Sequence, residues 1–389
     1  MAVDQLKLTQ GASLGDRIAV QRPPHRLERL RAWMAQESVD ACVVFGPQNV
    51  SHLGGYARYW GGPAGVVIGR DGTRSLVVMF DERPVAQELG EADNVLSYGE
   101  RGFGLNLNPL PLLASVVAAT PEVSNARRIG VSDEIGGVAD LLRRECDAEH
   151  VDATGALYRI RLVKDEDELV KVLRSYELCW LGQQAVAEGA QRPGVTEIEL
   201  FTAALAAAQN TNGGPIEFLT DLLSGPKTAE VCCPIHIASP RVVQDGEAVI
   251  ADVALGAQGY WGDSAETHIA GSNAEVSEMR SALLGILARA TSELRTGNTG
   301  ASIFEGIHRR ILEAFPGGEF PHHGGHGLAL SAFEDPHLIP GDETPLENWM
   351  VMAIEPGVYF PGRIGARVEN VFIVTPDGGV ELRDAMGAR

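Results

Sequence analysis

The sequence predicts two domains, an α/β domain over residues 1–160 and a strand-rich α+β domain over residues 161–389. Before residue 160, short apolar runs alternate with helical patterns, as is typical of an α/β domain with a largely buried sheet. After residue 161, two long helical patterns are followed by apolar, strand-like runs. The length of 389 residues also suffices for two ordinary domains.

The expected elements of the first domain follow from hydrophobic periodicity. Leu27, Leu30 and Met34 lie at helical spacing within residues 26–37, and the apolar residues 40–45 form a strand-like run. Further strands are predicted at residues 65–68, 75–79, 95–98 and 128–131, and further helices at residues 82–89, 110–118 and 138–146.

In the second domain, Lys164 and the acidic residues 165–168 open a helix that is predicted to reach about residue 190, since acids suit the first turn of a helix. Thr196 and Glu199 form the pattern of a capping box for a second helix, to about residue 209. Other helices are predicted at residues 274–295 and 303–314, and strands at 248–253, 268–270, 349–354 and 366–374.

Composition limits the classes of function. The formal net charge of −20 disfavours nucleic acid and membrane surfaces as partners, because both are themselves anionic. Five cysteines without CxxC spacing suggest neither a disulfide framework nor a zinc ribbon. Residues 1–24 have no apolar segment typical of a secretory signal, so a cytoplasmic location is expected.

Two aspartates are spaced for a shared site. Asp252 ends an apolar, strand-like run, and Asp263 follows after a segment that contains Gly256 and Gly259. A strand, a turn and a returning strand would bring the two carboxylates together. Two adjacent carboxylates repel each other unless a proton or a cation lies between them. Taken alone, each aspartate is more simply explained as a turn or edge residue that faces water.

Three more acid or imidazole groups stand in strand or glycine-rich contexts. His326 lies in a glycine-rich segment, where its ring could approach a metal without crowding. Glu355 follows a strand-like run, and Glu369 lies within another, with Arg367 on the same face. An acid in an apolar strand is costly to bury unless it is paired or bound to a metal. Together with the two aspartates, the set suits Mn, Fe, Co or Zn.

The order and flanking residues of these five positions resemble the pita-bread metallohydrolases, the family of aminopeptidase P, prolidase, creatinase and methionine aminopeptidase. The matching segments are Asp252 in its strand, Gly259-Tyr260 before Asp263, Gly325-His326-Gly327, Glu355-Pro-Gly-Val-Tyr359 and Arg367-Val-Glu369. The resemblance implies an N-terminal creatinase/prolidase-like domain and a pita-bread catalytic domain. It also implies two divalent ions, with Mn expected and Fe, Co or Zn as alternatives, and a homodimer.

The resemblance assigns further residues. His322, four residues before His326, matches a histidine that holds substrate, and His236 is the nearest candidate for a second. A third would lie seven residues after His326, where this chain has Phe333. Glu266 stands where the family usually has an arginine. Substrate contacts are expected from Phe333, Arg367 and the aromatic loop with Tyr56, Arg58 and Trp60, which would wall a partner subunit's pocket.

Three hypotheses follow. In the first, a metal-bound hydroxide attacks the amide carbonyl of a short, Xaa-Pro-like peptide, and Glu355 takes and returns a proton. In the second, the same centre serves a lyase or a small-metabolite hydrolase, in a closed pocket lined by Phe333, Trp261 and Phe218. In the third, the protein is a non-catalytic binding protein.

Overall fold

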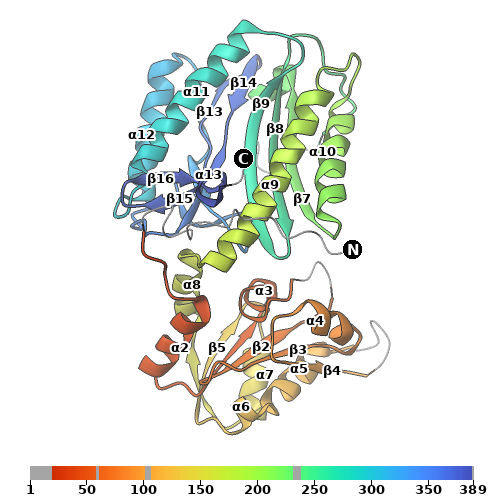
Figure 1. Cartoon of the computed structure of the whole chain (residues 1–389), viewed down its shortest axis with the longest axis vertical. Coiled ribbons are helices and arrows are strands. Elements are labelled where there is room, and N and C mark those ends of the chain that lie inside the picture. Colours follow the sequence, from red (N-terminus) through yellow and green to blue (C-terminus); the bar gives the residue numbers. More distant parts are fainter. Residues whose placement is uncertain (1–19, 58–60, 101–106, 231–237, 388–389) are drawn as a thin grey trace. The chain divides into compact units, whose positions relative to one another are not determined.

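The computed structural model describes residues 20–57, 61–100, 107–230 and 238–387, and the chain divides into two compact units (Figure 1). The N-terminal unit is Pro24–Arg161. The C-terminal unit is Leu162–Arg389 together with the described part of Met1–Pro23.

The N-terminal unit is built on a six-stranded sheet of order β4-β3-β2-β1-β5-β6. Strand β2 is antiparallel to both of its neighbours, whereas β3–β4, β1–β5 and β5–β6 are parallel pairs. The strands are β1 (Ala41–Phe45), β2 (Gly65–Gly69), β3 (Arg74–Met79), β4 (Asn94–Tyr98), β5 (Arg128–Asp133) and β6 (Glu149–Asp152).

Helices give this sheet a hydrophobic core on each face. Cys42 and Val44 of β1 point into one core, and Val43 and Phe45 point into the other. Burial on both faces explains why β1 is apolar throughout instead of alternating. The helices are α2 (Arg26–Gln36), α3 (Pro47–Gly54), α4 (Arg83–Leu89), α5 (Pro109–Ala118), α6 (Pro121–Ser124), α7 (Val138–Glu145) and α8 (Thr154–Leu162), with a short 3-10 helix at Phe80–Glu82.

The strands of the C-terminal unit form three groups. They are a sheet of order β7-β8-β9, a sheet of order β11-β10-β12-β15-β16 and the hairpin β13–β14. The strands are β7 (Glu217–Ser224), β8 (Ala248–Ala257), β9 (Tyr260–Ile269), β10 (Gly325–Gly327), β11 (Glu334–His337), β12 (Val351–Ile354), β13 (Gly357–Phe360), β14 (Ile364–Arg367), β15 (Asn370–Thr375) and β16 (Gly378–Glu381).

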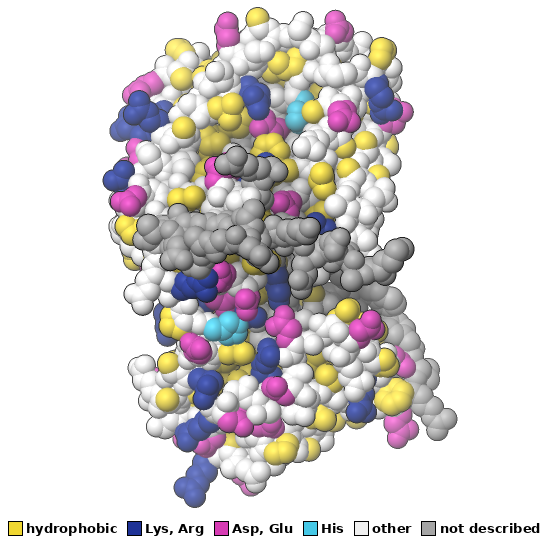
Figure 2. Space-filling view, in the orientation of Figure 1, with side chains coloured by type: hydrophobic (Ala, Val, Ile, Leu, Met, Phe, Trp, Pro, Cys, Tyr) yellow, Lys and Arg dark blue, Asp and Glu magenta, His cyan; other side chains and the backbone are white. Residues whose placement is uncertain are grey.

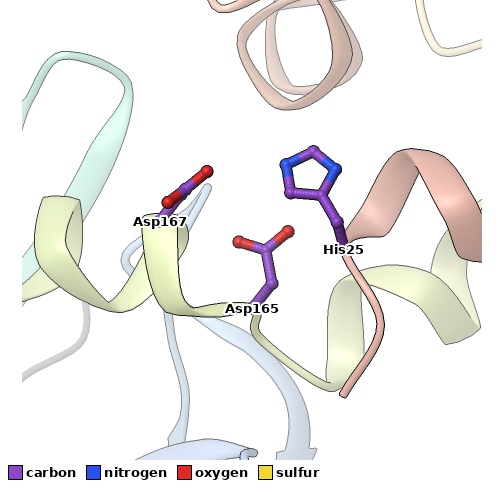
Figure 3. Close-up of side chains that lie close together, drawn as sticks. All are labelled: His25, Asp165 and Asp167. Carbon is purple, nitrogen blue, oxygen red and sulfur yellow. The ribbon is translucent and has the colours of Figure 1, made fainter. Parts of the chain in front are cut away.

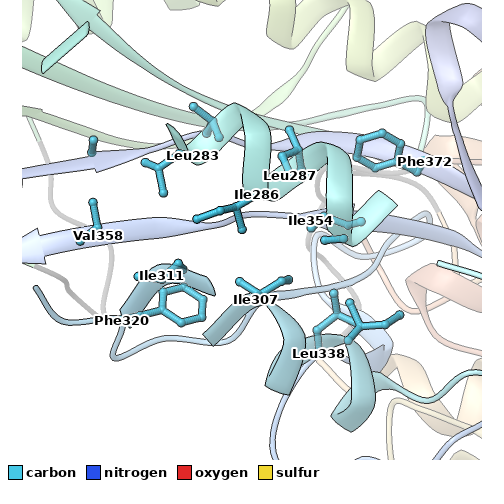
Figure 4. Close-up of a cluster of buried hydrophobic side chains, with 14 of the residues drawn as sticks. Leu283, Ile286, Leu287, Ile307, Ile311, Phe320, Leu338, Ile354, Val358 and Phe372 are labelled. Carbon is cyan, nitrogen blue, oxygen red and sulfur yellow. The ribbon is translucent and has the colours of Figure 1, made fainter. Parts of the chain in front are cut away.

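Two helix pairs cover these strands. α9 packs against β8, β9 and α10, and α11 packs against α12 and the C-terminal strands (Figure 1). Figure 4 shows the core formed by the second pair, where Leu283 and Ile286 of α11 and Ile307 of α12 meet Ile354 and Val358. The helices are α9 (Glu166–Gly189), α10 (Glu197–Asn212), α11 (Ala274–Glu293), α12 (Gly300–Ala314) and α13 (Leu382–Met386), with a 3-10 helix at Gly225–Ala229.

Side-chain caps fix the beginning of the two long helices. Asp165, seen at the N-terminal end of α9 in Figure 3, accepts a hydrogen bond from the Glu168 backbone, and the Glu168 side chain accepts one from the Asp165 backbone. Thr196 and Glu199 form the predicted capping box of α10. Each box satisfies two backbone donors that the first helical turn leaves free.

Three expectations for the strands were wrong in detail. Asp252 lies inside β8 and not at its end, because the strand continues to Ala257. The strand predicted at 366–374 is interrupted at Val368 and Glu369, where the chain leaves its partner β13 and pairs with β12. His326 lies on the short strand β10 and not in a loop.

The glycines around His326 serve the sheet. A Cβ atom on Gly325 would lie 2.1 Å from the Ala353 carbonyl oxygen, and one on Gly327 would lie 2.4 Å from that of Asp335. Only glycine therefore lets β10 fit between its two neighbours.

On the face drawn in Figure 2, acidic and basic side chains of the described residues lie interspersed. Within the described ranges, no helix combines the length and the apolar character that a membrane crossing requires.

Candidate metal centre

The hairpin of β8 and β9 brings Asp252 and Asp263 to one face of the sheet. Gln258 and Gly259, both with positive φ, form its two-residue turn. The register pairs Asp252 with Ala265 and Asp263 with Ala254, so the two aspartates are diagonal neighbours. The predicted strand, turn and returning strand are confirmed.

Packing of α9 fixes Asp263. A Cβ atom on Gly262 would lie 2.2 Å from the backbone nitrogen of Tyr176, so the glycine allows α9 to approach β9 directly. The Ser175 hydroxyl donates a hydrogen bond to the carbonyl of Tyr260 at 2.8 Å. Asp263 is therefore held on a buried and well-anchored strand.

His326 presents one ring nitrogen to the centre. Its Nδ1 lies 2.9 Å from the Gly327 carbonyl oxygen, which can only accept, so Nδ1 carries the proton. Nε2 is then an unprotonated acceptor. Burial lowers the pKa of His326 to about 4, which keeps the ring neutral. A ring whose second nitrogen donates to a carbonyl is the usual arrangement of a metal-binding histidine.

Glu355 and Glu369 reach the same place from two other elements. Glu355 directly follows β12, as predicted, and its backbone nitrogen donates to the Gly324 carbonyl at 3.0 Å. Glu369 stands at the break between β14 and β15, where it pairs through its backbone with Ala265 of β9.

The side chains converge on the Nε2 atom of His326. Oδ2 of Asp263 lies 3.8 Å away, Oε1 of Glu355 lies 3.7 Å away, and Oε1 of Glu369 lies 3.9 Å away. Asp263, His326 and Glu369 each offer a ligand atom within 4.8 Å of the others'. We call these three residues the Asp263 cluster.

The Asp263 cluster is buried without a countercharge. Asp263 Oδ1 and both carboxylate oxygens of Glu369 have no hydrogen-bond partner among the described residues. Burial, and then the neighbouring carboxylates, raise the pKa of Asp263 and of Glu369 well above their usual values. Orphaned buried oxygens facing a neutral imidazole nitrogen fit a divalent cation, which would supply the missing charge.

Asp252 has a different environment. Its carboxylate is bound by the guanidinium of Arg367, which also lies 3.5 Å from Asp221. Burial raises the pKa of Asp252 to about 6, while Arg367 opposes the rise. Asp221 belongs to β7 and stands directly opposite Asp252 in the register.

Arg367 also begins a chain of hydrogen bonds. Its Nε donates to the Tyr359 hydroxyl at 2.8 Å, and that hydroxyl lies 2.9 Å from Nε2 of His322. Nδ1 of His322 faces the His323 carbonyl at 2.7 Å and must donate, so Nε2 accepts from Tyr359. Burial lowers the pKa of His322 to about 3, consistent with a neutral ring. We call Asp252, Asp221, Arg367, Tyr359 and His322 the Asp252 network.

These contacts bear on two predicted roles. Arg367 is buried and engaged by protein groups, so its position is that of a residue holding Asp252, and the prediction of a substrate contact has no support in its placement. Both ring nitrogens of His322 already have protein partners. Its predicted contact with substrate would require one of these bonds to open.

Phe333 does lie at the centre. Its ring centroid is 4.4 Å from that of His326 and 5.9 Å from that of His323, and the residue is 50% exposed. Phe333 therefore offers an apolar surface beside the candidate ligands.

Other predicted site residues lie elsewhere. Tyr56 is only 5% exposed and packs within the hydrophobic core of the N-terminal unit, and its role at a partner's pocket stays a prediction. Phe218 packs edge-on against Phe201 of α10, since it stands on the strand face opposite Asp221. His236, Arg58 and Trp60 lie outside the described residues.

Glu266 is explained by a partner on another helix. Its carboxylate binds Arg280 of α11 through Nε at 2.8 Å. The acid in place of an arginine is thus paired within the unit. It gives no reason to expect an altered substrate.

Sequence reasoning missed three residues: His323, Tyr359 and Asp221. The first two lay inside segments that had already been singled out, and only their side-chain contacts reveal them. Asp221 could not be found because β7 itself was not predicted.

A buried cluster of carboxylates and an imidazole, contributed by strands of two antiparallel sheets, defines a candidate metallohydrolase. The chain belongs to metallopeptidase family M24, whose model matches residues 174–376. The creatinase/prolidase N-terminal domain matches residues 26–163. The predicted family and fold are thereby confirmed, an α/β N-terminal domain preceding a pita-bread catalytic domain.

Individual relatives agree with the family. The Xaa-Pro dipeptidase of Pyrococcus furiosus is 27% identical over 369 residues, covering 92% of this chain and 97% of that protein. The "Probable dipeptidase PepE" of Mycobacterium bovis is 32% identical over 234 residues, which span 60% of this chain and only 61% of that relative. The crystal structure of the prolidase from Pyrococcus horikoshii has the same fold, with a TM-score of 0.74, 22% identity and coverage of 92% and 97%.

Proposed function

We propose that this protein is a metal-dependent peptidase that hydrolyses short Xaa-Pro peptides at a dinuclear centre of Asp252, Asp263, His326, Glu355 and Glu369. The observation that carries the proposal is the Asp263 cluster, in which Asp263 Oδ1 and both carboxylate oxygens of Glu369 have no hydrogen-bond partner among the described residues. The name of the Pyrococcus furiosus relative, Xaa-Pro dipeptidase, supports these substrates, and the name of the PepE relative supports a dipeptidase.

Bound divalent ions would supply an activated water and polarise the scissile carbonyl. The protein's part is to hold the carboxylates rigidly and to manage the proton. The nearby imidazoles, His323 first, outweigh the effect of burial and lower the pKa of Glu355, so its carboxylate is ionised and able to accept a proton. Arg367 holds Asp252, and Tyr359 joins Arg367 to His322, so both side chains are held in place beside the residues that would bind the ions.

The assay follows from the proposal. The protein is stripped with a chelator, reloaded separately with Mn, Co, Fe or Zn, and given Xaa-Pro dipeptides and tripeptides. We expect cleavage at the bond before proline with at least one metal, Mn being the first choice. Absence of cleavage with all four metals would overturn the peptidase proposal. A homodimer is proposed alongside it, and its mass in solution is measured by light scattering.

Phe333 favours one alternative, a lyase or small-metabolite hydrolase that uses the same centre. A phenyl ring cannot donate a hydrogen bond to a developing oxyanion, and losing one such donor costs about 3 kcal/mol of transition-state stabilisation. The variant Phe333→His restores a donor. Faster Xaa-Pro cleavage in this variant supports the peptidase. No Xaa-Pro cleavage by either protein, with metal bound in both, supports the alternative.

A further inference from the structure

His323 stands beside the proposed centre without a role in the five-ligand set. Its ring centroid is 5.5 Å from that of His326, at an interplanar angle of 72°. Its Nδ1 lies 3.0 Å from Oε1 of Glu355, the same oxygen that faces Nε2 of His326.

This short distance is not a hydrogen bond. Nδ1 of His323 is buried and, within the described residues, has no hydrogen-bond partner. Two strong polar atoms thus lie at ion-pair distance without a well-formed hydrogen bond between them. A buried polar atom left in this way is costly unless a further group satisfies it.

The distance between Nδ1 of His323 and Oε1 of Glu355 fits a metal ion as the further group. Nitrogen and oxygen ligands lie about 2.1 Å from a first-row metal ion, so two ligands at a right angle are roughly 3.0 Å apart. The observed separation of 3.0 Å matches two neighbouring ligands of one ion. The 3.7 Å between Glu355 and His326 matches two ligands at a wider angle, about 120° on the same geometry.

The two neighbouring histidines show what a satisfied ring looks like. Both nitrogens of His322 have protein partners, at 2.7 and 2.9 Å. His326 donates through Nδ1 and directs Nε2 to the centre. His323 resembles His326 in presenting one unpartnered nitrogen to Glu355.

We propose that Nδ1 of His323 is an additional ligand of the ion bound by Glu355, and that it shifts the metal preference of the centre toward Co²⁺ and Zn²⁺. The proposal rests on the proposed function, since it assumes a divalent ion at Glu355. Imidazole nitrogen favours Co and Zn, whereas Mn prefers an oxygen-rich site. The competing interpretation is a simple ion pair between His323 and Glu355.

Metal affinity tests the proposal without reference to activity. Dissociation constants for Co²⁺ and Mn²⁺ are measured by competition with a chelator for the wild type and for His323→Ala. We expect Co²⁺ binding to weaken roughly 10–100-fold and Mn²⁺ binding to weaken less. His308→Ala, a histidine of α12 that stacks on Phe304, is the matched control and should leave both constants unchanged. Equal, small changes for both metals would overturn the proposal and support the ion pair.

A spectroscopic measurement does not depend on the folding of a variant. Pulsed electron paramagnetic resonance of Cu²⁺-loaded wild type should detect at least two coordinated imidazole nitrogens, and a single one would overturn the proposal. In a folded His323→Gln variant, one of them should disappear, whereas in His322→Gln the count should stay the same.

The two proposals fail differently. A wild type that binds no divalent ion contradicts both the proposed function and the role of His323. If the wild type binds ions and His323→Ala binds them with the same affinity and the same spectrum, only the role of His323 is contradicted.

Discussion

The Asp263 cluster and the Asp252 network lie on the same β8–β9 hairpin, yet they handle negative charge in opposite ways. Asp252 is neutralised by Arg367, whose guanidinium the protein itself provides. Asp263 and Glu369 lie beside a neutral imidazole and other carboxylates, and Asp263 Oδ1 and both Glu369 oxygens have no hydrogen-bond partner among the described residues. The protein itself balances the charge of Asp252 in the Asp252 network, whereas the charge of the Asp263 cluster would be balanced only by a bound cation.

This difference predicts that substitutions in the Asp252 network reduce stability, whereas substitutions in the Asp263 cluster reduce metal binding and activity. A buried ion pair that is broken from one side leaves an uncompensated charge and destabilises the fold. An orphaned carboxylate already carries that penalty, and a protein keeps it where binding or catalysis requires the group. Substitutions on the two sides should consequently change different observables.

The largest effect is expected from Asp263→Asn. The change removes an anionic ligand, so kcat/KM for an Xaa-Pro dipeptide should fall about 10³-fold or more, equivalent to about 4 kcal/mol in the barrier. The metal-free protein should unfold no more easily than the wild type, because the variant loses an unpaired buried carboxylate. Steady-state kinetics and urea denaturation in a chelator measure the two quantities.

Glu266→Gln is the matched control on the same strand. Glu266 is also buried, but it is paired with Arg280 and faces away from the cluster. Its loss should reduce stability while kcat/KM stays within about threefold of the wild type, since no centre contact changes. If Asp263→Asn lost stability and Glu266→Gln lost activity, the contrast between the two sides would be wrong.

On the Asp252 network the expected loss is in stability. Arg367→Met removes the guanidinium that pairs with the part-buried Asp252 and lies close to the buried Asp221, which should lower the free energy of unfolding by about 3 kcal/mol. Arg363→Met removes an exposed arginine paired with Glu275 and should cost less than about 1 kcal/mol. Urea midpoints of both variants, taken without metal, check the difference. Equal losses would mean that Arg367 does not carry the charge balance.

Metal binding should raise the free energy of unfolding through the Asp263 cluster. At a free-ion concentration of 100 times the dissociation constant, the wild type should gain about 2.7 kcal/mol in the free energy of unfolding. The gain should disappear in Asp263→Asn and remain in Glu266→Gln. Thermal unfolding with and without added Mn²⁺ measures it, and a gain retained in Asp263→Asn would show that the ions bind elsewhere.

Most of the fold could be predicted because its elements have strong local signals. The periodicity of α2, the capping boxes of α9 and α10 and the apolar run of β1 are visible in the chain. Several elements were not predicted, and for β7 and α3 the reason is a mixed signal. β7 carries Glu217, Thr220 and Asp221 among its apolar residues, and α3 contains polar residues that tertiary contacts bury.

The candidate metal ligands could be predicted from the sequence, but the hydrogen bonds and ion pairs of their side chains could not. The order of the five acid and imidazole residues indicated the family, because each stands in a distinctive segment. Which partner each side chain chooses depends on strand register and on residues over one hundred positions away, such as Arg367 for Asp252. The residues that flank Arg367 in the sequence do not indicate that its guanidinium pairs with Asp252 and not with the nearby Glu369.

The smallest effect is expected where the two sides meet, at the Tyr359 hydroxyl. Tyr359→Phe removes the group that accepts from Arg367 and donates to His322, leaving Nε2 of His322 and Nε of Arg367 unpaired. We expect a loss of about 1–2 kcal/mol in stability and roughly a tenfold drop in kcat/KM if the network also positions Asp252 for an ion. Tyr260→Phe is the matched control, because its hydroxyl lies 3.4 Å from Glu168, among contacts away from the centre. A similar stability loss in both variants with an activity loss only in Tyr359→Phe would show that the Asp252 network positions the centre besides neutralising it. If kcat/KM were unchanged in Tyr359→Phe, the network would be a purely structural device, and the functional side of the hairpin would be the Asp263 cluster alone.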